Sequence, residues 1–285
     1  MKISTVSRQK QKKLYVREKA VILCILTGLF LLAVIFAQEF CPYDPYAQDY
    51  SMVLSPPSPA HPFGTDRYGR DMLSRVIAGA RTSVFSALFL AAATSAAGTA
   101  AGMICGYFGG RIDGAVMGIA DLCVAFPSLV FALAIAALLN GGMENAVLAL
   151  SLVSWPKYAR LARSRTLTLK QADFIQAARV AGGSSLQILT RHILPNLLGR
   201  MLVTASLDVG TMMMELAGLS FLGLGASPPS AEWGSMMSGG RSMLQTYPWT
   251  VITPGIGIFV SVALFNLLGD ALRDWLTFQG EEIGG

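Results

Sequence analysis

The hydrophobic pattern of the chain is dominated by long stretches that carry no charged side chain. Three of them are uncharged throughout: residues 82–110, 122–143 and 242–269. Each is longer than the roughly 20 residues that an α-helix needs to cross about 30 Å of hydrocarbon. These stretches therefore predict three transmembrane helices.

A fourth span is predicted at residues 20–37, an 18-residue apolar run that follows a strongly basic arm. A cleaved signal peptide is the alternative. Its apolar core would be longer than the usual range of about 7 to 15 residues, and no Ala-x-Ala pattern follows it. We therefore favour an uncleaved first transmembrane helix.

Two weaker candidates complete the set. The run from Ala146 to Pro156 is short, but it can cross the bilayer if its helix continues towards Leu161. The run from Met201 to Leu224 is interrupted by two acidic residues, Asp208 and Glu215. The sequence thus predicts an all-α integral membrane protein with six transmembrane helices.

Composition supports a membrane protein, because 53% of the residues are apolar and only 14% are charged, against about a quarter charged in soluble domains. Residues 38–81 contain six prolines and predict an irregular segment outside the membrane. We divide the chain into residues 1–81, which hold the basic arm, the first span and this segment, and residues 82–285, a five-helix core.

A polar and basic segment, residues 157–195, lies between two predicted spans and has the pattern of folded helices. An apolar face at three- and four-residue spacing predicts a short helix from about Gln171 to Ala181. Gly182-Gly183 is expected to end that helix. Ser184 followed by Gln187 is a capping-box pattern that predicts a second helix, from Leu186 to about Ile193, before Pro195.

The placement of basic residues predicts the orientation of the chain. With six spans, seventeen of the 22 Lys and Arg residues fall on the side that holds both termini and residues 157–195, and five fall on the other. Basic residues accumulate on the cytoplasmic side, so both termini are expected to be cytoplasmic. The net charge of +5 then reflects topology, and a nucleic-acid partner is not indicated.

Within residues 157–195, Gln176-Ala177-Ala178, Gly182 and the closing Leu194-Pro195 resemble the EAA loop of ABC-importer permeases. In that family a short coupling helix of the loop fits a groove on a cytoplasmic ATPase. Two positions differ from the family pattern: Gln176 stands where Glu is usual, and His192 stands where an apolar residue is usual.

The resemblance covers nearly everything from Tyr43 to Asp274 and points to the peptide/nickel class of permeases. Its blocks outside the loop are residues 61–75, 219–225, 232–234 and 265–274. The resemblance implies a type I importer-like fold in a bacterial plasma membrane, translocating di- or oligopeptides or a nickel chelate. It also implies a second homologous permease, two cytoplasmic ATP-binding subunits and an extracytoplasmic substrate-binding protein as partners.

Two sets of residues inside the predicted membrane region are functional candidates. Gly98, Gly102 and Gly106 repeat every four residues, a spacing that lets two helices approach closely, so we expect a helix-packing face. Acidic residues inside a span are costly and usually face protein or water. Asp208 and Glu215, which share a helix face with Met212, are therefore candidates for lining a translocation path, with interior hydrogen bonding as the alternative.

Several function classes lack support in the sequence. No phosphate-binding Gly-x-x-x-x-Gly-Lys-Ser/Thr motif is present, so we expect no ATPase site. The two histidines and four cysteines lack catalytic or metal-binding spacing, so no catalytic residue, metal or cofactor is predicted. A stand-alone secondary transporter remains the alternative function.

The segments outside the membrane give weaker signals. Asp66, Arg67, Arg70 and Asp71 are expected to form exposed ion pairs, each worth only about 0 to 1 kcal/mol, that position the segment. In the loop 226–249, Trp and Tyr side chains predict either interface anchors or a surface that meets a binding protein.

Overall fold

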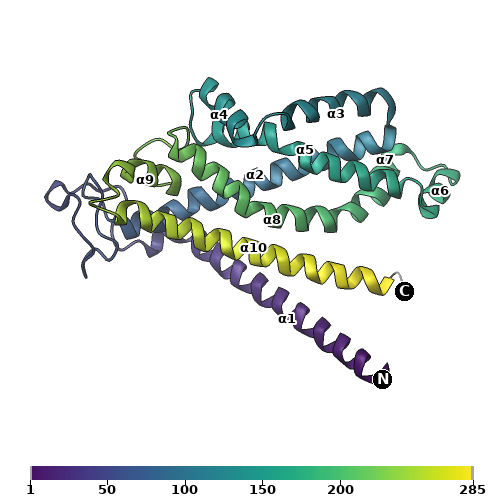
Figure 1. The fold of residues 1–285 in the computed structure, drawn as a ribbon, viewed down its shortest axis with the longest axis horizontal. Helices are drawn as coiled ribbons and strands as arrows, with labels where there is room; N and C mark the ends of the chain where they lie inside the picture. The colour runs from purple at the N-terminus through teal and green to yellow at the C-terminus, as the bar shows by residue number, and fades with distance from the viewer. Residues whose placement is uncertain (1, 284–285) are drawn as a thin grey trace.

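The computed structural model describes residues 2–283, and helices account for nearly all of the regular structure in this range (Figure 1). The described residues form no β-strand, only an isolated bridge between Thr65 and Asp71. The predicted all-α class is therefore confirmed. The long helices are α1 (Lys2–Ile35), α2 (Met72–Phe108), α3 (Gly110–Val124), α4 (Ser128–Leu138), α5 (Met143–Leu169), α8 (Leu194–Phe221) and α10 (Trp249–Ile283).

Short elements connect these helices at the two ends of the bundle. At one end, α6 (Asp173–Val180), α7 (Ser185–Gln187) and the π-helical turn η3 (Ile188–Ile193) join α5 to α8. At the other end, α9 (Trp233–Gly240) and η4 (Arg241–Met243) join α8 to α10, and η1 (Ala37–Phe40) and η2 (Tyr50–Met52) lie between α1 and α2. We refer to these as the α6 end and the α9 end. Both chain termini lie at the α6 end (Figure 1).

The centre of the bundle is the contact between α2 and α5, with α8 beside both of them. Helix α10 packs on α8, and α1 lies along α10 at the edge. The core is rich in small side chains, including Ala87, Ala91, Ala132 and Ala149, around larger ones such as Leu90. Small residues suit a membrane bundle, since close packing rather than the hydrophobic effect drives helix association in lipid.

Helix length and composition do not confirm the expected number of six spans. Four helical stretches are long and apolar enough to cross a membrane: Tyr15–Ile35, Met72–Phe108, Ser185–Phe221 and Trp249–Thr277. The bent pair α3 and α4 would make a fifth. Helix α5 contains the expected Ala146–Pro156 run, but its second half is basic, so its composition is too polar to meet the same criterion.

The expected span at 122–143 is wrong as a single helix. Helix α3 ends at Val124, and α4 begins at Ser128 after a bend of 93°. Pro127 lies at this break, where its ring removes a backbone donor and disfavours a helical conformation of the preceding residue. Residues 111–121 were not assigned to a helix from the sequence, yet they lie within α3, the longer arm of this bent pair.

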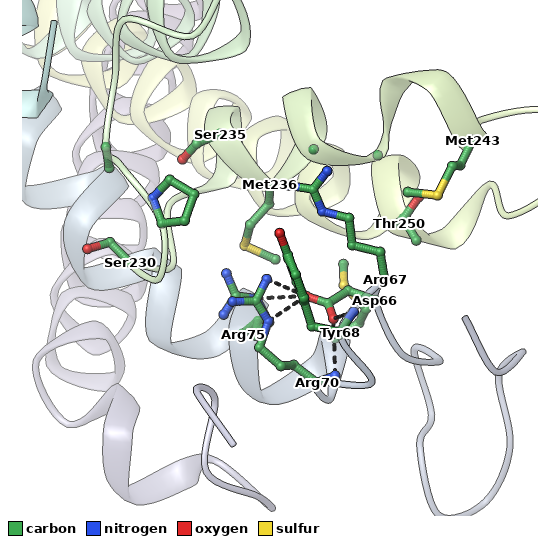
Figure 2. A pocket seen from close by; sticks show the side chains of 15 residues that line it. Asp66, Arg67, Tyr68, Arg70, Arg75, Ser230, Ser235, Met236, Met243 and Thr250 are labelled. Atoms are coloured by element: carbon green, nitrogen blue, oxygen red, sulfur yellow. Dashed lines mark hydrogen bonds and ion pairs between the residues drawn. The ribbon is translucent and has the colours of Figure 1, made fainter. Parts of the chain in front are cut away.

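The ion pairs expected to be exposed are instead buried at the α9 end. Asp66, Arg70 and Arg75 are only 8%, 7% and 4% exposed. The Asp66 carboxylate accepts from Arg70 Nε at 2.7 Å and lies 3.6 Å from Arg75 Nε (Figure 2). Asp71 caps α2 through Ser74 and lies 2.9 Å from His61 Nδ1. The expected pair of Asp66 with Arg70 is therefore present, but the expected exposure was wrong, and Arg75 and His61 are the further partners in place of Arg67.

This buried cluster shows that the Pro-rich segment is folded onto the bundle. Trp249 Nε1 donates to the carbonyl of Thr65 at 3.0 Å, and Arg75 donates to the carbonyl of Pro45 at 2.9 Å. Glu232, which is 2% exposed, caps α9 by accepting from the N–H groups of Gly234 and Ser235. The α9 end is thus a tightly hydrogen-bonded layer.

Candidate coupling loop and intramembrane polar cluster

Helix α6 forms where the sequence predicts a helix, and a glycine pair ends it. Gly182 has a φ of +82°, a left-handed conformation that costs glycine little. Its N–H donates to the carbonyl of Arg179, and the N–H of Gly183 donates to the carbonyl of Ala178, both at 3.0 Å. These two bonds form a Schellman motif, which satisfies carbonyls at the end of α6.

The chain restarts through the predicted capping box. The N–H of Gln187 donates to Ser184 Oγ at 3.3 Å, and the N–H of Ser184 donates to Gln187 Oε1 at 3.0 Å. The capping box is therefore confirmed. It begins a helical stretch at Ser185.

The predicted end of this second helix before Pro195 is wrong. The stretch passes through η3 into α8, so that Ser185–Phe221 is one continuous helical segment. Pro195 lies in the first turn of α8, where the missing N–H costs little. In the π-helical turn η3, which comes directly before α8, backbone hydrogen bonds join residues five apart instead of four. This wider spacing occurs next to Pro195, which has no backbone N–H to donate.

One face of α6 is anchored to the bundle. Ile175 is fully buried and packs with residues of α2, η3 and α8, among them Tyr107, Ile188 and Ile193. Ala178 lies against the same cluster. Burying a side chain of this size stabilises the contact by about 1.5 to 3 kcal/mol, so α6 is held as part of the bundle end.

Polar contacts add to this anchor. Lys170 Nζ donates to the carbonyl of Tyr107 at 2.5 Å, and the Arg179 guanidinium lies 5.3 Å from the centre of the Tyr107 ring. Gln176 Nε2 donates to the carbonyl of Lys170 at 2.9 Å. A glutamate has no donor when ionised and could not make this last bond, so Gln176 strengthens the turn between α5 and α6.

The opposite face of this loop is apolar and exposed. Val180 is 90% exposed, Leu186 70% and Phe174 45%, and Ala177 beside them is also exposed. A cluster of exposed apolar side chains on a short anchored helix is typical of a protein-binding site.

The three glycines of α2 lie against α5. A Cβ atom on Gly102 would come within 2.0 Å of the carbonyl oxygen of Ala159. Equivalent atoms on Gly98 and Gly106 would come within 2.5 Å of Trp155 and 2.7 Å of Thr166. The backbones of α2 and α5 therefore touch over two helical turns, a contact that only glycine allows.

Asp208 is buried between α8 and α5 and is fully engaged. Its carboxylate accepts from Lys157 Nζ at 2.5 Å and from the Tyr158 hydroxyl at 2.8 Å. Tyr158 is buried, whereas the Lys157 side chain is 60% exposed. Asp208 therefore neutralises a lysine that reaches the surface of this subunit. Met212, one turn along α8, is buried and lies 3.8 Å from Thr94 Oγ1.

Glu215 lies two turns from Asp208 on α8 and contacts the bent pair of helices. Its Oε1 accepts from Ser128 Oγ at 3.2 Å, directly after the break at Pro127. Glu215 is partly buried. Asp208 and Glu215 thus connect α8 to α5 and to α4 respectively.

The partners Lys157, Tyr158 and Ser128 were missed as site residues from the sequence. Lys157 and Tyr158 were both assigned to the polar segment 157–195, whereas they lie in the middle of α5. Each partner is 50 or more residues away from its acid in sequence, so no local pattern could have revealed the pairs.

Comparison with known proteins identifies the family. Residues 98–278, more than half of the chain, match the model of the binding-protein-dependent transport system inner membrane component. The chain belongs to this family. The range includes α6, both glycines that end it, Asp208 and Glu215, and the predicted resemblance to ABC-importer permeases is confirmed.

Curated relatives match along most of their lengths. The dipeptide transport system permease protein DppC of Alkalihalophilus pseudofirmus is 40% identical over 269 residues, covering 94% of this chain and 88% of the relative. The probable D,D-dipeptide transport system permease protein DdpC of Escherichia coli K12 is 41% identical, covering 88% and 85%. The glutathione transport system permease protein GsiD of Shigella flexneri is 44% identical, covering 87% and 82%.

A solved structure supports the fold. An inward-facing conformation of the MetNI methionine ABC transporter matches with a TM-score of 0.57 at 18% identity, covering 72% of this chain and 97% of that one. The chain is thus a multi-pass membrane permease of the importer type.

Proposed function

We propose that this chain is one of two homologous permease subunits of an ATP-driven importer for short peptides. Two ATP-binding subunits would dock at the α6 end, and an extracytoplasmic substrate-binding protein at the α9 end. The observation that carries the proposal is α6 itself, with Ile175 buried in the bundle and Val180 exposed on the opposite face. A helix held in this way suits mechanical coupling.

The α6 end is cytoplasmic in this proposal, and so are both chain termini, which lie at the same end (Figure 1). The excess of Lys and Arg supports this orientation, because basic loops are retained on the cytoplasmic side. The protein would be a multi-pass component of the bacterial plasma membrane. Residues 82–285 would form the permease core, and residues 1–81 an accessory helix and outer segment.

The coupling residues are proposed to be Gln176, Ala177, Ala178, Gly182, Leu194 and Pro195. ATP-driven closure of the partner subunits would push on α6, and the buried side chain of Ile175 would pass this displacement to α2 and η3. Since η3 continues into α8 without a break, the displacement would tilt α8. The chain itself would bind no cofactor and hydrolyse no ATP.

For the translocation path we propose separate roles for the two acids of α8. Asp208 would hold Lys157 in place, while Glu215, with Ser128, would face the path and Met212 would pack between them. If the Glu215→Gln variant transports at the normal rate, the path role of Glu215 is wrong. If the Asp208→Asn variant does so, Asp208 is not needed to position Lys157.

The substrate class rests on the relatives. The three described above are named for a dipeptide, a D,D-dipeptide and glutathione, all of them small peptides. These names favour a peptide over a nickel chelate for this chain. Uptake assays in proteoliposomes that compare a radiolabelled dipeptide with a nickel chelate would decide between these substrates.

The docking proposal is tested by copurification. We expect the double variant Phe174→Ser, Val180→Ser to lose its ATP-binding subunits when purified from the native membrane. Leu244→Ser is a matched control, because Leu244 is 45% exposed at the α9 end, and it should retain them. Retention of the subunits by the double variant would contradict the proposal. Transport by the purified chain alone would instead support the alternative, a stand-alone secondary transporter.

A further inference from the structure

We propose that the α9 end contains a binding site for the carboxylate of a small solute. The site is a cavity enclosed by residues 66–75, the loop that follows α8, and α9 (Figure 2). The inference rests on the proposed importer function and adds a recognition step within this subunit, before the solute moves between the helices.

The cavity has two parts that share walls. The inner part is lined by Asp66, Arg70 and Arg75, and the part that opens to the surface by Ser220 and Arg241. Arg67 lines both parts, as do Pro228, Ser235 and Gly239. The two parts are therefore adjacent.

Cationic side chains outnumber anionic ones around this cavity. Four arginines line it, Arg67, Arg70, Arg75 and Arg241, against one acid, Asp66. The Asp66 carboxylate already accepts hydrogen bonds from the Arg70 side chain and from the backbone N–H groups of Tyr68 and Arg70.

The two outermost arginines are available to a ligand. Arg67 and Arg241 are exposed and make no ion pair with the carboxylates that the structure describes. Glu232 lines neither part of the cavity, and its carboxylate caps α9 by accepting from the N–H groups of Gly234 and Ser235. An arginine pair of this kind attracts an anion.

A buried hydroxyl in the wall supplies an independent indication of a ligand. Ser220 is 1% exposed, and its Oγ makes no hydrogen bond with the described residues. A buried polar group without a partner costs about 1 to 3 kcal/mol, so such groups are rare and call for an explanation. Gly225 lies directly against this hydroxyl, where a Cβ atom would come within 1.8 Å. A ligand oxygen that accepts from Ser220 would satisfy it.

The chemistry and shape of the cavity favour a carboxylate on a free molecule. The guanidinium group presents a planar fork of donors that matches a carboxylate. Arg70 and Arg75 are more than nine-tenths buried, so only a slender group can reach the inner part. The terminal carboxylate of a short peptide has these properties, whereas the acidic surface of a folded protein would reach only Arg67 and Arg241.

The test uses the assembled transporter in lipid nanodiscs without its binding protein, titrated with L-alanyl-L-alanine. We expect saturable binding that weakens about tenfold or more in the Arg67→Gln, Arg241→Gln double variant, as for the loss of hydrogen bonds between charged groups. Ser220→Ala should weaken binding by a smaller factor. The dipeptide C-terminal amide should bind the normal protein as weakly as the dipeptide binds the double variant.

Arg81→Gln is the matched control, because Arg81 is exposed near the same end and lines neither part of the cavity. It should bind the dipeptide normally. Equal binding by all variants, or equal binding of dipeptide and amide, would overturn the inference. In a parallel titration with the binding protein alone, a double variant that loses affinity only for that protein would also overturn it, since the carboxylate would then come from that protein. Copurification of the ATP-binding subunits with these variants would show that assembly of the proposed importer is unaffected.

Discussion

The two ends of this bundle use charged and apolar residues in opposite ways. At the α9 end, Asp66, Arg70 and Arg75 are buried and hydrogen-bonded, so polar groups hold the layer together. At the α6 end, Val180 and Leu186 are apolar and exposed, while the buried contact is a single apolar cluster around Ile175. The difference teaches that the α9 end pairs its buried charges within the chain, whereas the α6 end leaves apolar side chains exposed.

The largest effect is expected from breaking the buried cluster of the α9 end. Asp66→Ala would leave Arg70 and Arg75 buried without their carboxylate, and removing one partner of a buried ion pair costs about 3 to 5 kcal/mol. Thermal unfolding in detergent should show a correspondingly large fall in stability. Glu39→Ala removes an exposed acid from the same segment and should leave the unfolding temperature unchanged. Equal unfolding temperatures for the two variants would contradict a structural role of the cluster.

A smaller effect is expected where the two ends are joined, at the contact between α2 and α5. Gly102→Ala would place a methyl group 2.0 Å from the Ala159 carbonyl, and overpacking of this kind costs about 1 to 3 kcal/mol. Gly114→Ala is the control, because its Cβ would meet nothing within 4 Å. If both variants unfold at the same temperature, the close approach of α2 and α5 is not needed for stability.

At the α6 end, replacing Gly182 should be unfavourable because of its backbone conformation and not because of steric contacts. A Cβ atom there would meet nothing within 4 Å, but the φ of +82° is unfavourable for alanine, at a cost of about 1 to 2 kcal/mol. We expect Gly182→Ala to increase amide hydrogen exchange in α6 while the exchange in α2 stays unchanged. Gly199→Ala, within α8, serves as the control. Unchanged exchange in α6 would argue against the Schellman motif as the end of this helix.

The smallest effect on stability is expected for the exposed face itself. Val180→Ser changes a side chain that is 90% exposed, and such surface substitutions usually alter stability by less than about 0.5 kcal/mol. The unfolding temperature of the purified subunit should therefore stay the same. A large fall would mean that the face is packed within the chain, and the contrast between the two ends would be lost.

Local signals in the sequence predicted local structure well. Gly182-Gly183 and the Ser184–Gln187 capping box specify their conformations through neighbouring atoms, and both turns formed as expected. Pro127 is an equally local signal for a helix break, but residues 122–143 were predicted as one span because the whole run is uncharged. Pro195 was misinterpreted in the opposite sense, because proline is also favoured in the first turn of a helix.

Contacts between distant residues could not be predicted in the same way. The partner of Asp208 is Lys157, 51 residues earlier, and it is determined by how α5 packs beside α8. The burial of Asp66 depends on the Pro-rich segment folding back over the bundle, which no periodic pattern encodes. The acids of the site were therefore recognisable from the sequence, whereas the groups that neutralise them required the structure.

The uninterrupted helix from Ser185 to Phe221 has a geometric consequence. Its 37 residues form a rod about 55 Å long at about 1.5 Å per residue, with the capping box at one tip and Ser220 at the other. A rod that pivots about its middle moves its two tips in opposite directions. A push at the capping box would therefore swing Ser220 the other way, and the shape of the cavity at the α9 end would change with each stroke at the α6 end.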